Sequence, residues 1–289
     1  MDLFIHQLFT GLSNGAIYAS MALAIVMIFR TTNLKNFAQG EMAMFSAFIA
    51  WWMLGLGVPY WIAFFITIAV SFVIGVLAER ILIRPVMNAP LLSILIVFFG
   101  IFVILHSLAG WIFGYEVKVF PSPFPEEAVF GTYITNHELG TIAIVGAMLL
   151  AIYAFLNFTK TGLAMRGVAE NQASCKLVGI NVNWMLGLGW GLAAAIGAVA
   201  GMLIAPVVYL DPSMMSGVLI YGFAGAILGG IDNPWGAVVG SLILGVVENL
   251  LGTYVIETEL RLSVALVLII AILLIRPNGI FGRTIVSRV

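Results

Sequence analysis

Residues 184–209 read WMLGLGWGLAAAIGAVAGMLIAPVVY and contain no charged side chain. A helix rises about 1.5 Å per residue, so this stretch can cross a hydrocarbon layer about 30 Å thick. Similar runs recur along the 289-residue chain, of which 62% is hydrophobic and only 9% charged. Soluble domains carry about a quarter of charged residues. The sequence therefore predicts an all-α polytopic transmembrane helix bundle and excludes a water-soluble fold.

The spans are predicted from nine apolar runs. Six are long enough to cross alone, at 8–29, 41–57, 58–78, 91–113, 139–158 and 184–209. Three weaker runs follow Pro212, at 217–231, 235–254 and 260–275. The run 217–231 would reach only about 22 Å as a helix, less than the hydrocarbon thickness. Two arrangements stay open: nine spans, which we favour, or seven spans with 217–251 as a re-entrant hairpin.

Basic residues predict the orientation, because Lys and Arg in short loops are retained on the cytoplasmic side. With the N-terminus outside and the C-terminus inside, ten of the twelve basic residues fall in inside segments. These ten are Arg30, Lys35, Arg80, Arg84, Lys160, Arg166, Lys176, Arg276, Arg283 and Arg288. Only Lys118 and Arg261 would lie outside. Residues 1–289 then form one transmembrane domain with an external loop at 114–138, interpreted as a solvated connector, and a cytoplasmic loop at 159–183.

Small residues are concentrated between Gly187 and Gly201, where glycine and alanine leave little side-chain bulk. Glycines four residues apart lie on one helix face and let two helices approach closely, which supplies packing where lipid removes the hydrophobic drive. Gly187 and Gly191 have this spacing, and so do Gly197 and Gly201. We therefore expect this helix to lie at the centre of the bundle or against another subunit.

Polar side chains within the apolar runs are candidates for a solute path, because ionisable groups at membrane depth are costly and usually functional. Glu248 is compatible both with a hydrogen bond to another helix and with a place in the path. His106 is typical of an interhelical hydrogen bond, and Glu79, beside Arg80, of a structural contact. The candidate path residues are Asn14, Tyr18, Asn36, Gln39, Glu41 and Glu248.

Motifs for catalysis, metal binding and ATP binding are missing from the sequence. The three histidines are scattered, and no Gly-rich phosphate loop with its Lys-Ser/Thr occurs. We therefore expect no enzymatic activity, and neither a metal nor a cofactor held by this chain. A net charge of −1 without a basic run also excludes nucleic acid as a partner. A transporter of this kind must take its energy from other proteins.

The loop 159–183 contains a candidate surface helix. Residues 163–178 have helix-forming composition with mixed apolar and charged faces, and Gly179 is a natural C-terminal stop. A separate ATPase could bind such a helix under the membrane, and an interfacial anchor helix would explain the pattern equally well.

This loop resembles the coupling loop of ABC-importer permeases, and specifically of the Liv-type permeases for branched-chain amino acids. The matching positions are Thr159, Gly162, Ala164, Arg166, Glu170, Gly179, Ile180 and Asn181. Stretches 11–19, 36–41 and 228–248 agree with the same family, and so does Glu79-Arg80 to Arg84-Pro85. The resemblance covers nearly the whole chain. Gln39 stands where the family often has His, and Lys35 where it often has an apolar residue.

The resemblance implies a multi-pass permease subunit in the bacterial inner membrane, surrounded by lipid, for a small polar solute such as a branched-chain amino acid. Its implied partners are a second homologous permease in a heterodimer, two cytoplasmic subunits that hydrolyse ATP, and a periplasmic or extracellular solute-binding protein. We expect polar ATPase contacts from Arg166 and Glu170. The full set of coupling residues is Gly162, Ala164, Arg166, Glu170, Lys176 and Gly179. The alternative is a self-contained channel for urea or an amide, with Asn233-Pro234-Trp235 as a single pore motif.

Overall fold

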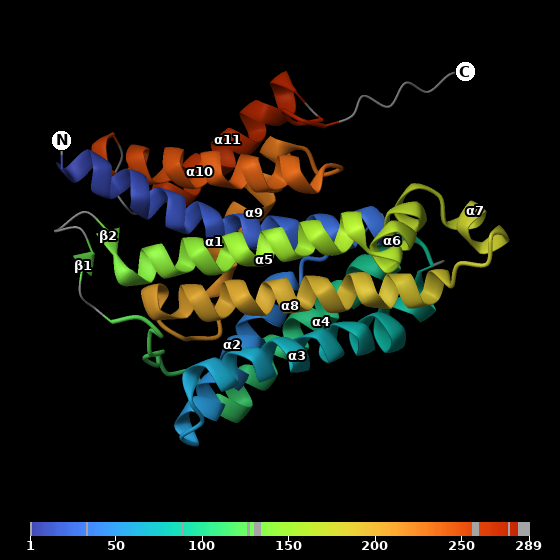
Figure 1. The fold of residues 1–289 in the computed structure, drawn as a ribbon, viewed down its shortest axis with the longest axis horizontal. Coiled ribbons are helices and arrows are strands. Elements are labelled where there is room, and N and C mark those ends of the chain that lie inside the picture. The colour runs from blue at the N-terminus through green and yellow to red at the C-terminus, as the bar shows by residue number, and fades with distance from the viewer. Residues whose placement is uncertain are drawn as a thin grey trace. The chain divides into compact units, whose positions relative to one another are not determined.

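The computed structural model describes residues 2–32, 34–87, 89–125, 128–129, 134–255, 260–276 and 278–282, and these residues are almost wholly helical (Figure 1). The long helices are α1 (Asp2–Thr32), α2 (Gln39–Gly55), α3 (Tyr60–Ala78), α4 (Leu91–Phe113), α5 (Asn136–Phe158), α8 (Val182–Val208), α9 (Met215–Gly229), α10 (Pro234–Tyr254) and α11 (Arg261–Ile275). The short elements are the π-helix η1 (Glu79–Ile83), the 3-10 turn η2 (Arg84–Val86), α6 (Lys160–Glu170), α7 (Gln172–Leu177), and the antiparallel strands β1 (Ala128–Val129) and β2 (Ile134–Thr135).

Each of the nine predicted apolar runs falls on a separate helix. Six helices of the described chain are long and apolar enough to cross a membrane: α1, α3 with the turns that follow it, α4, α5, α8 and α10. Helix α2 has 17 residues, and α9 and α11 have 15 each. The prediction of an all-α protein with several helices of membrane-spanning length is confirmed. Part of the predicted external loop, together with Arg283 and Arg288 of the predicted inner C-terminus, lies outside the described residues.

The predicted single helix over 163–178 is wrong, because this segment forms two helices. Asn171 ends α6 and begins α7 with extended backbone angles, φ −155° and ψ 100°. Its side-chain oxygen accepts a hydrogen bond from the amide of Ser174, which is the capping role that asparagine prefers to a helix interior. The predicted stop at Gly179 is confirmed, since its φ is +83° and its amide bonds back to the carbonyl of Lys176.

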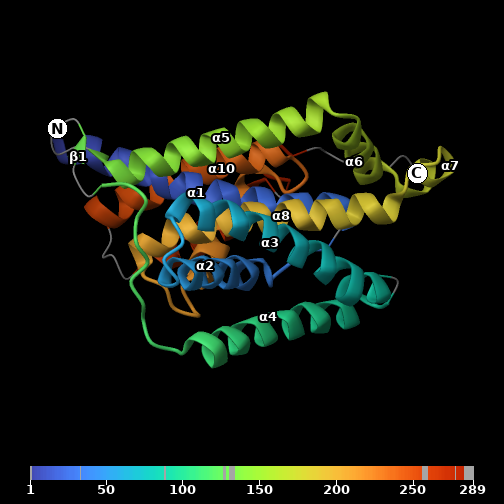
Figure 2. The ribbon, with the colours of Figure 1, turned by 60° about the horizontal axis from the view of Figure 1, so that its bottom comes forward.

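The chain divides into two compact units. The first comprises residues 1–26, 124–145 and 217–289, and the second comprises 27–123 and 146–216. In the first unit, α10 packs against α11 and against the N-terminal part of α1 (Figure 1). In the second unit, α2 and α3 pack against α8, and α4 packs against α2 (Figure 2).

Glycine permits the close crossing of α1 and α10 in the first unit. A Cβ on Gly15 would lie 3.0 Å from the Cα of Leu242, and a Cβ on Gly11 would lie 2.9 Å from the Cα of Val246. A Cβ on Gly245 would in turn meet the backbone of Gly15. The two backbones therefore touch where any side chain would separate them.

The glycines of α8 do the same in the second unit. A Cβ on Gly201 would lie 2.5 Å from the carbonyl oxygen of Ala43, and one on Gly197 would lie 2.6 Å from Nε2 of Gln39. Most residues of α8 are buried. The backbone of α8 therefore lies in direct van der Waals contact with α2 at these two glycines.

Nearer its N-terminal end, α8 contacts α3 and the turn that follows α3. A Cβ on Gly191 would lie 2.8 Å from the ring of Phe72 and from Cγ2 of Val76. Gly187 has more room, because the nearest atom to its Cβ position is Oε2 of Glu79, at 3.5 Å. The packing glycines thus differ in tolerance, with Gly201 the most restricted and Gly187 the least.

The first part of the loop 114–138 is attached to the second unit. The backbones of Lys118 and Leu210 exchange two hydrogen bonds of 2.9 Å. The indole Nε1 of Trp51 donates to the carbonyl of Val119 at 3.2 Å. These contacts hold this end of the loop against α2 and the residues that follow α8.

We expect Gly201→Ala to lower the thermal unfolding midpoint of the purified protein in detergent, because the added methyl group meets the backbone of Ala43. Overpacking of this kind typically costs about 1–3 kcal/mol. Gly100→Ala is the matched control, since it adds the same methyl group within α4 where no described residue lies within 4 Å of the Cβ position. Equal midpoints for the two variants would contradict the packing described for α8.

Candidate functional site

Three predicted path residues gather at the start of α2 in the second unit. Asn36 donates through Nδ2 to Oε1 of Gln39 at 3.3 Å. Gln39 donates through Nε2 to the carbonyl of Ala193 on α8 at 2.9 Å. Asn36, Gln39 and Glu41 are all buried. Gln39 therefore connects α2 to α8 by a hydrogen bond, beside the space that Gly197 leaves free.

Glu41 faces His106 of α4. Nδ1 of His106 lies 3.4 Å from Oε2 of Glu41, and neither atom makes a hydrogen bond within the described part of the chain. The imidazole ring also stacks on Phe102, with ring centroids 6.1 Å apart. His106 thus lies between helices, as the sequence suggested, but at the distance of an ion pair and without the alignment of a hydrogen bond.

The other predicted path residues belong to the first unit. The ring of Tyr18 stacks on Tyr221 of α9, with centroids 4.7 Å apart and an interplanar angle of 19°. The hydroxyl of Tyr18 donates a hydrogen bond to the carboxylate of Glu248, and Tyr221 lies within range of its charge. Asn14 lies one turn before Tyr18 on α1 and is half-buried. The six path residues therefore form two groups of three, one in each unit.

Sequence reasoning missed two residues that join the group of the first unit, Tyr221 and Arg261. Oε1 of the buried Glu248 lies 3.9 Å from Nε of Arg261, at the start of α11. The positive-inside rule had placed Arg261 in an outer loop, and Tyr221 lies in a run whose helical face has no pattern to identify it. The only available signal was charge, because an unpaired Glu248 at membrane depth requires a cationic partner.

Two residues expected to contact an ATPase also make contacts within the second unit. Arg166 is half-buried, and its Nη1 donates to Oδ1 of Asn157 at 2.9 Å. Glu170 accepts a hydrogen bond from Arg30 on α1 at 3.3 Å. Gly162 packs directly against the backbone at the end of α5. These contacts fix α6 to the ends of α1 and α5.

Apolar side chains of the same loop are exposed instead. The exposed fraction is 62% for Leu163, 88% for Leu177 and 75% for Val178. Lys176 and Gly179 beside them are also exposed, and Ala164 is half-buried. Figure 1 shows α6 and α7 beyond the N-terminal end of α8. Exposed large apolar residues often mark an interaction surface, and we call Leu163, Leu177 and Val178 the apolar loop residues.

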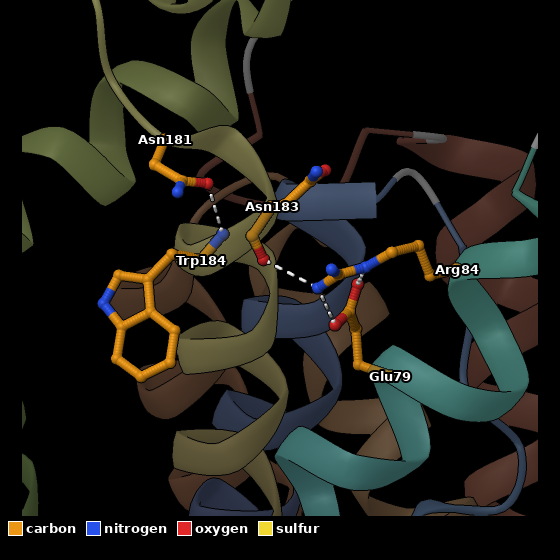
Figure 3. Close-up of polar contacts among 5 residues, drawn as sticks. All are labelled: Glu79, Arg84, Asn181, Asn183 and Trp184. Carbon is orange, nitrogen blue, oxygen red and sulfur yellow. Dashed lines mark hydrogen bonds and ion pairs between the residues drawn. The ribbon is translucent and has the colours of Figure 1, made fainter.

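A partly buried ion pair at the end of α3 is joined to the start of α8 by a hydrogen bond from its arginine (Figure 3). The carboxylate of Glu79 is fully buried and accepts hydrogen bonds from Nε and Nη2 of Arg84, at 3.1 and 2.6 Å. Nη2 of Arg84 also donates to the backbone carbonyl of Asn183, at 2.9 Å. We call this arrangement of Glu79, Arg84 and the Asn183 carbonyl the clamp. A bidentate charged pair of this kind is among the strong hydrogen-bonding arrangements in proteins.

Local sequence explains why the clamp forms. Glu79 and Arg84 are five residues apart, which is the spacing of a π-helical turn, and η1 supplies that turn. On the other side, the side-chain oxygen of Asn181 accepts from the amide of Trp184 at 3.1 Å and caps α8 (Figure 3). The cap positions the first turn of α8, which includes the carbonyl of Asn183.

The motif Asn233-Pro234-Trp235 begins α10. The side-chain oxygen of Asn233 accepts from the amides of Trp235 and Gly236, each at 3.2 Å, and Pro234 occupies the first helical turn. Asn233 also donates to the carbonyl of Phe281 at 3.3 Å. Asparagine at the cap followed by proline is a common way to start a helix. The local structure thus accounts for this motif without a pore.

Comparison with solved structures shows a similar fold in PsaBC from Streptococcus pneumoniae in complex with Fab. The match has a TM-score of 0.51 and 15% sequence identity, and covers 94% of this chain and 93% of that one. This likeness concerns the fold alone.

Sequence comparison finds full-length relatives. The high-affinity branched-chain amino acid transport system permease protein LivH of Escherichia coli (strain K12) is 30% identical, over 99% of this chain and 98% of that protein. The corresponding protein BraD of Pseudomonas aeruginosa is 31% identical with the same coverage. The sequence model of the family described as branched-chain amino acid transport system / permease component matches residues 7–273. The chain therefore belongs to the family of branched-chain amino acid transport system permease components.

Proposed function

We propose that this chain is the membrane-spanning permease subunit of an ABC importer that carries a branched-chain or related amino acid across the bacterial inner membrane. The supporting observation is the similarity to LivH and BraD along essentially the whole chain. ATP is hydrolysed by two cytoplasmic partner subunits, because the chain has no ATP-binding motif. A second homologous permease and an external solute-binding protein complete the assembly. The self-contained channel is disfavoured, because these relatives are named as permeases of transport systems.

For the membrane arrangement we propose nine crossings, with the N-terminus outside and the C-terminus inside. Helix α10 has 21 residues and a length of about 31 Å, enough to cross the hydrocarbon layer. A re-entrant hairpin over 217–251 does not require so long a helix, so the length of α10 favours nine crossings. The distribution of Lys and Arg supports the orientation, with 114–138 outside and 159–183 in the cytoplasm.

The loop 159–183 is the proposed coupling element. The apolar loop residues, with Lys176 and Gly179, form the surface that contacts an ATPase. Arg166 and Glu170 contribute by fixing α6 to the ends of α5 and α1, so that a displacement of the loop also displaces those helices.

The clamp carries the same displacement to the bundle. The loop leads through Gly179 directly into Asn181, the cap of α8. Arg84 holds the first turn of α8 to the end of α3. Movement of the loop therefore moves α8 and α3 together. The packing of α8 against α2 extends this movement to the polar group at Gln39.

The importer is tested by uptake of radiolabelled leucine in cells that lack their own branched-chain amino acid importers. Expression of this chain with its partner permease, ATPases and binding protein should restore uptake. Uptake should cease when the ATPases are inactivated by mutation. Uptake by this chain alone, or without ATP hydrolysis, would overturn the proposed function in favour of a channel.

Leu177→Asp should reduce ATP-driven leucine uptake at least tenfold, because an aspartate cannot replace an apolar contact in an ATPase cleft. The ATPases should no longer copurify with the permease pair, whereas the pair itself should remain assembled. Leu177→Met is the matched control and should behave as the wild type. Normal uptake by the aspartate variant would show that α7 does not contact the ATPase.

Arg84→Gln should lower the thermal unfolding midpoint, because it leaves the buried carboxylate of Glu79 without its cationic partner. In a fully buried pair this costs about 3–5 kcal/mol, and the 30% exposure of Arg84 reduces that cost. The double variant Glu79→Gln/Arg84→Gln should recover much of that stability, since no buried charge is left unpaired. Its leucine uptake per assembled complex should stay low, because the carbonyl of Asn183 is no longer held. Wild-type uptake by the double variant would show that the clamp stabilises the fold but does not transmit the movement of the loop.

A further inference from the structure

Glu248 lies in the interior of the first unit without a closed ion pair. It is the only charged residue of α10, and its side chain is 3% exposed. A charged group at membrane depth is costly and normally pairs with a second charge or serves a function. Tyr18 of α1 donates a hydrogen bond to it, and Tyr221 of α9, stacked on Tyr18, lies within range of its charge. Four helices of the unit therefore meet at this carboxylate when the arginine of α11 is included.

Arg261 reaches Glu248 across the face of α10. Its Nη1 lies 3.5 Å from Oδ1 of Asn249, and Asn249 donates in turn to the backbone carbonyl of Gln7 at 2.6 Å. Gly252, four residues after Glu248 on the same face of α10, leaves the space that the arginine side chain occupies. A Cβ on Gly252 would meet Nε, Cγ and Cδ of Arg261. The position of the guanidinium thus depends on one glycine.

The ion pair between Glu248 and Arg261 is open. Charged N–H···O⁻ bonds normally measure about 2.7–2.9 Å, and Arg–carboxylate pairs are often bidentate. Here Nε of Arg261 lies 3.9 Å from Oε1 of Glu248. Within the described residues, Oε2 of Glu248 and Nε of Arg261 are buried atoms without any hydrogen bond. Buried polar atoms almost always have partners, so one acceptor and one donor stand ready for a further group.

The surroundings of the pair are aromatic and aliphatic. The rings of Tyr18 and Tyr221 stack on each other, and both tyrosines interact with Glu248 and Arg261. Tyr221 also packs against the buried cluster of Ala224, Leu244 and Ala265. The side chain of Arg261 is 26% exposed, so the guanidinium side of the pair is open to the surroundings. An apolar wall next to one anionic and one cationic group favours a ligand with both charges and a short apolar side chain.

We propose that Glu248 and Arg261 bind the two charged ends of a zwitterionic α-amino acid. Its ammonium group donates to Oε2 of Glu248, its carboxylate accepts from the guanidinium of Arg261, and its side chain lies against Tyr18 and Tyr221. This inference rests on the proposed function and locates the solute of that importer within this chain. Bound solute would satisfy the atoms that lack partners, and it would add no net charge to the membrane interior.

A structural ion pair between α10 and α11 is the competing explanation. The two roles differ in what they require. A structural contact is satisfied by two neutral amides, which can hydrogen-bond to each other, whereas a zwitterion site needs both charges. The double variant Glu248→Gln/Arg261→Gln therefore separates them.

The experiment measures leucine uptake by the whole importer, assembled from this chain and its partners, with assembly checked by size-exclusion chromatography. Glu248→Gln, Arg261→Gln and the double variant should each lose uptake at least tenfold. Gly252→Ala should cause a comparable loss, because it displaces Arg261 while both charges remain. The matched control Gly217→Ala adds a methyl group at a position with no neighbour within 4 Å in the described part of the chain, and it should transport as the wild type.

A second readout detects binding without transport. Leucine at millimolar concentration should raise the unfolding midpoint of the purified permease pair, because a ligand of the folded state stabilises it. Isoamylamine, which lacks the carboxylate, and 4-methylpentanoate, which lacks the ammonium group, should not. The leucine shift should disappear in the double variant and persist in Gly217→Ala.

The outcomes separate the two proposals. Wild-type uptake by the double variant, or a leucine shift that the double variant retains, would overturn the site and leave the importer intact. If the wild-type assembly imports no amino acid, the proposed function fails, and a leucine shift specific to both charged ends would still support the site. Absence of that shift in the wild type would overturn the site in either case.

Discussion

Contact between backbones at glycine is the constraint on which the rest of this structure depends. Lipid tails are as apolar as leucine, so helices in a bilayer do not gain stability by hiding apolar surface from water. Gly201 against Ala43 and Gly15 against Gly245 instead bring main chains together directly. The contacts that add direction, such as Gln39 to the carbonyl of Ala193, form only because these helices are already close. The glycines thus determine where the polar groups of each unit can meet, because they let the helices that carry those groups come close together.

Helix positions could be predicted from the sequence, because each apolar run reports directly the requirement for length and hydrophobicity in a bilayer. The break at Asn171 could not, since helix-forming composition across 163–178 outweighed a single capping residue. The orientation of Arg166 and Glu170 was also not predictable. Both carry charges that suit a partner protein. In the fold, however, Arg166 bonds to Asn157 at the end of α5, and Glu170 pairs with Arg30, which lies 140 residues earlier on α1.

The candidate site was predictable only in part, for a similar reason. Glu248 and Tyr18 stood out as polar groups within apolar helices, and the structure brings them together. Their partner Arg261 lies next to a loop, where a charge carries no information about depth. Its role depends on the length of its side chain and on the space above Gly252, and both are properties of tertiary packing.

The wide turn at η1 has a mechanical consequence. A π-helical turn holds one residue more than an α-helical turn, so a return of Glu79–Ile83 to regular winding would rotate the following residues by about 100° around the axis. Such a rotation would carry the guanidinium of Arg84 away from both of its acceptors at once. The extra residue therefore makes helical register and charge pairing inseparable at this point. Any change of register at this junction would therefore move the chain by whole residues, and each such step would break the contacts of Arg84.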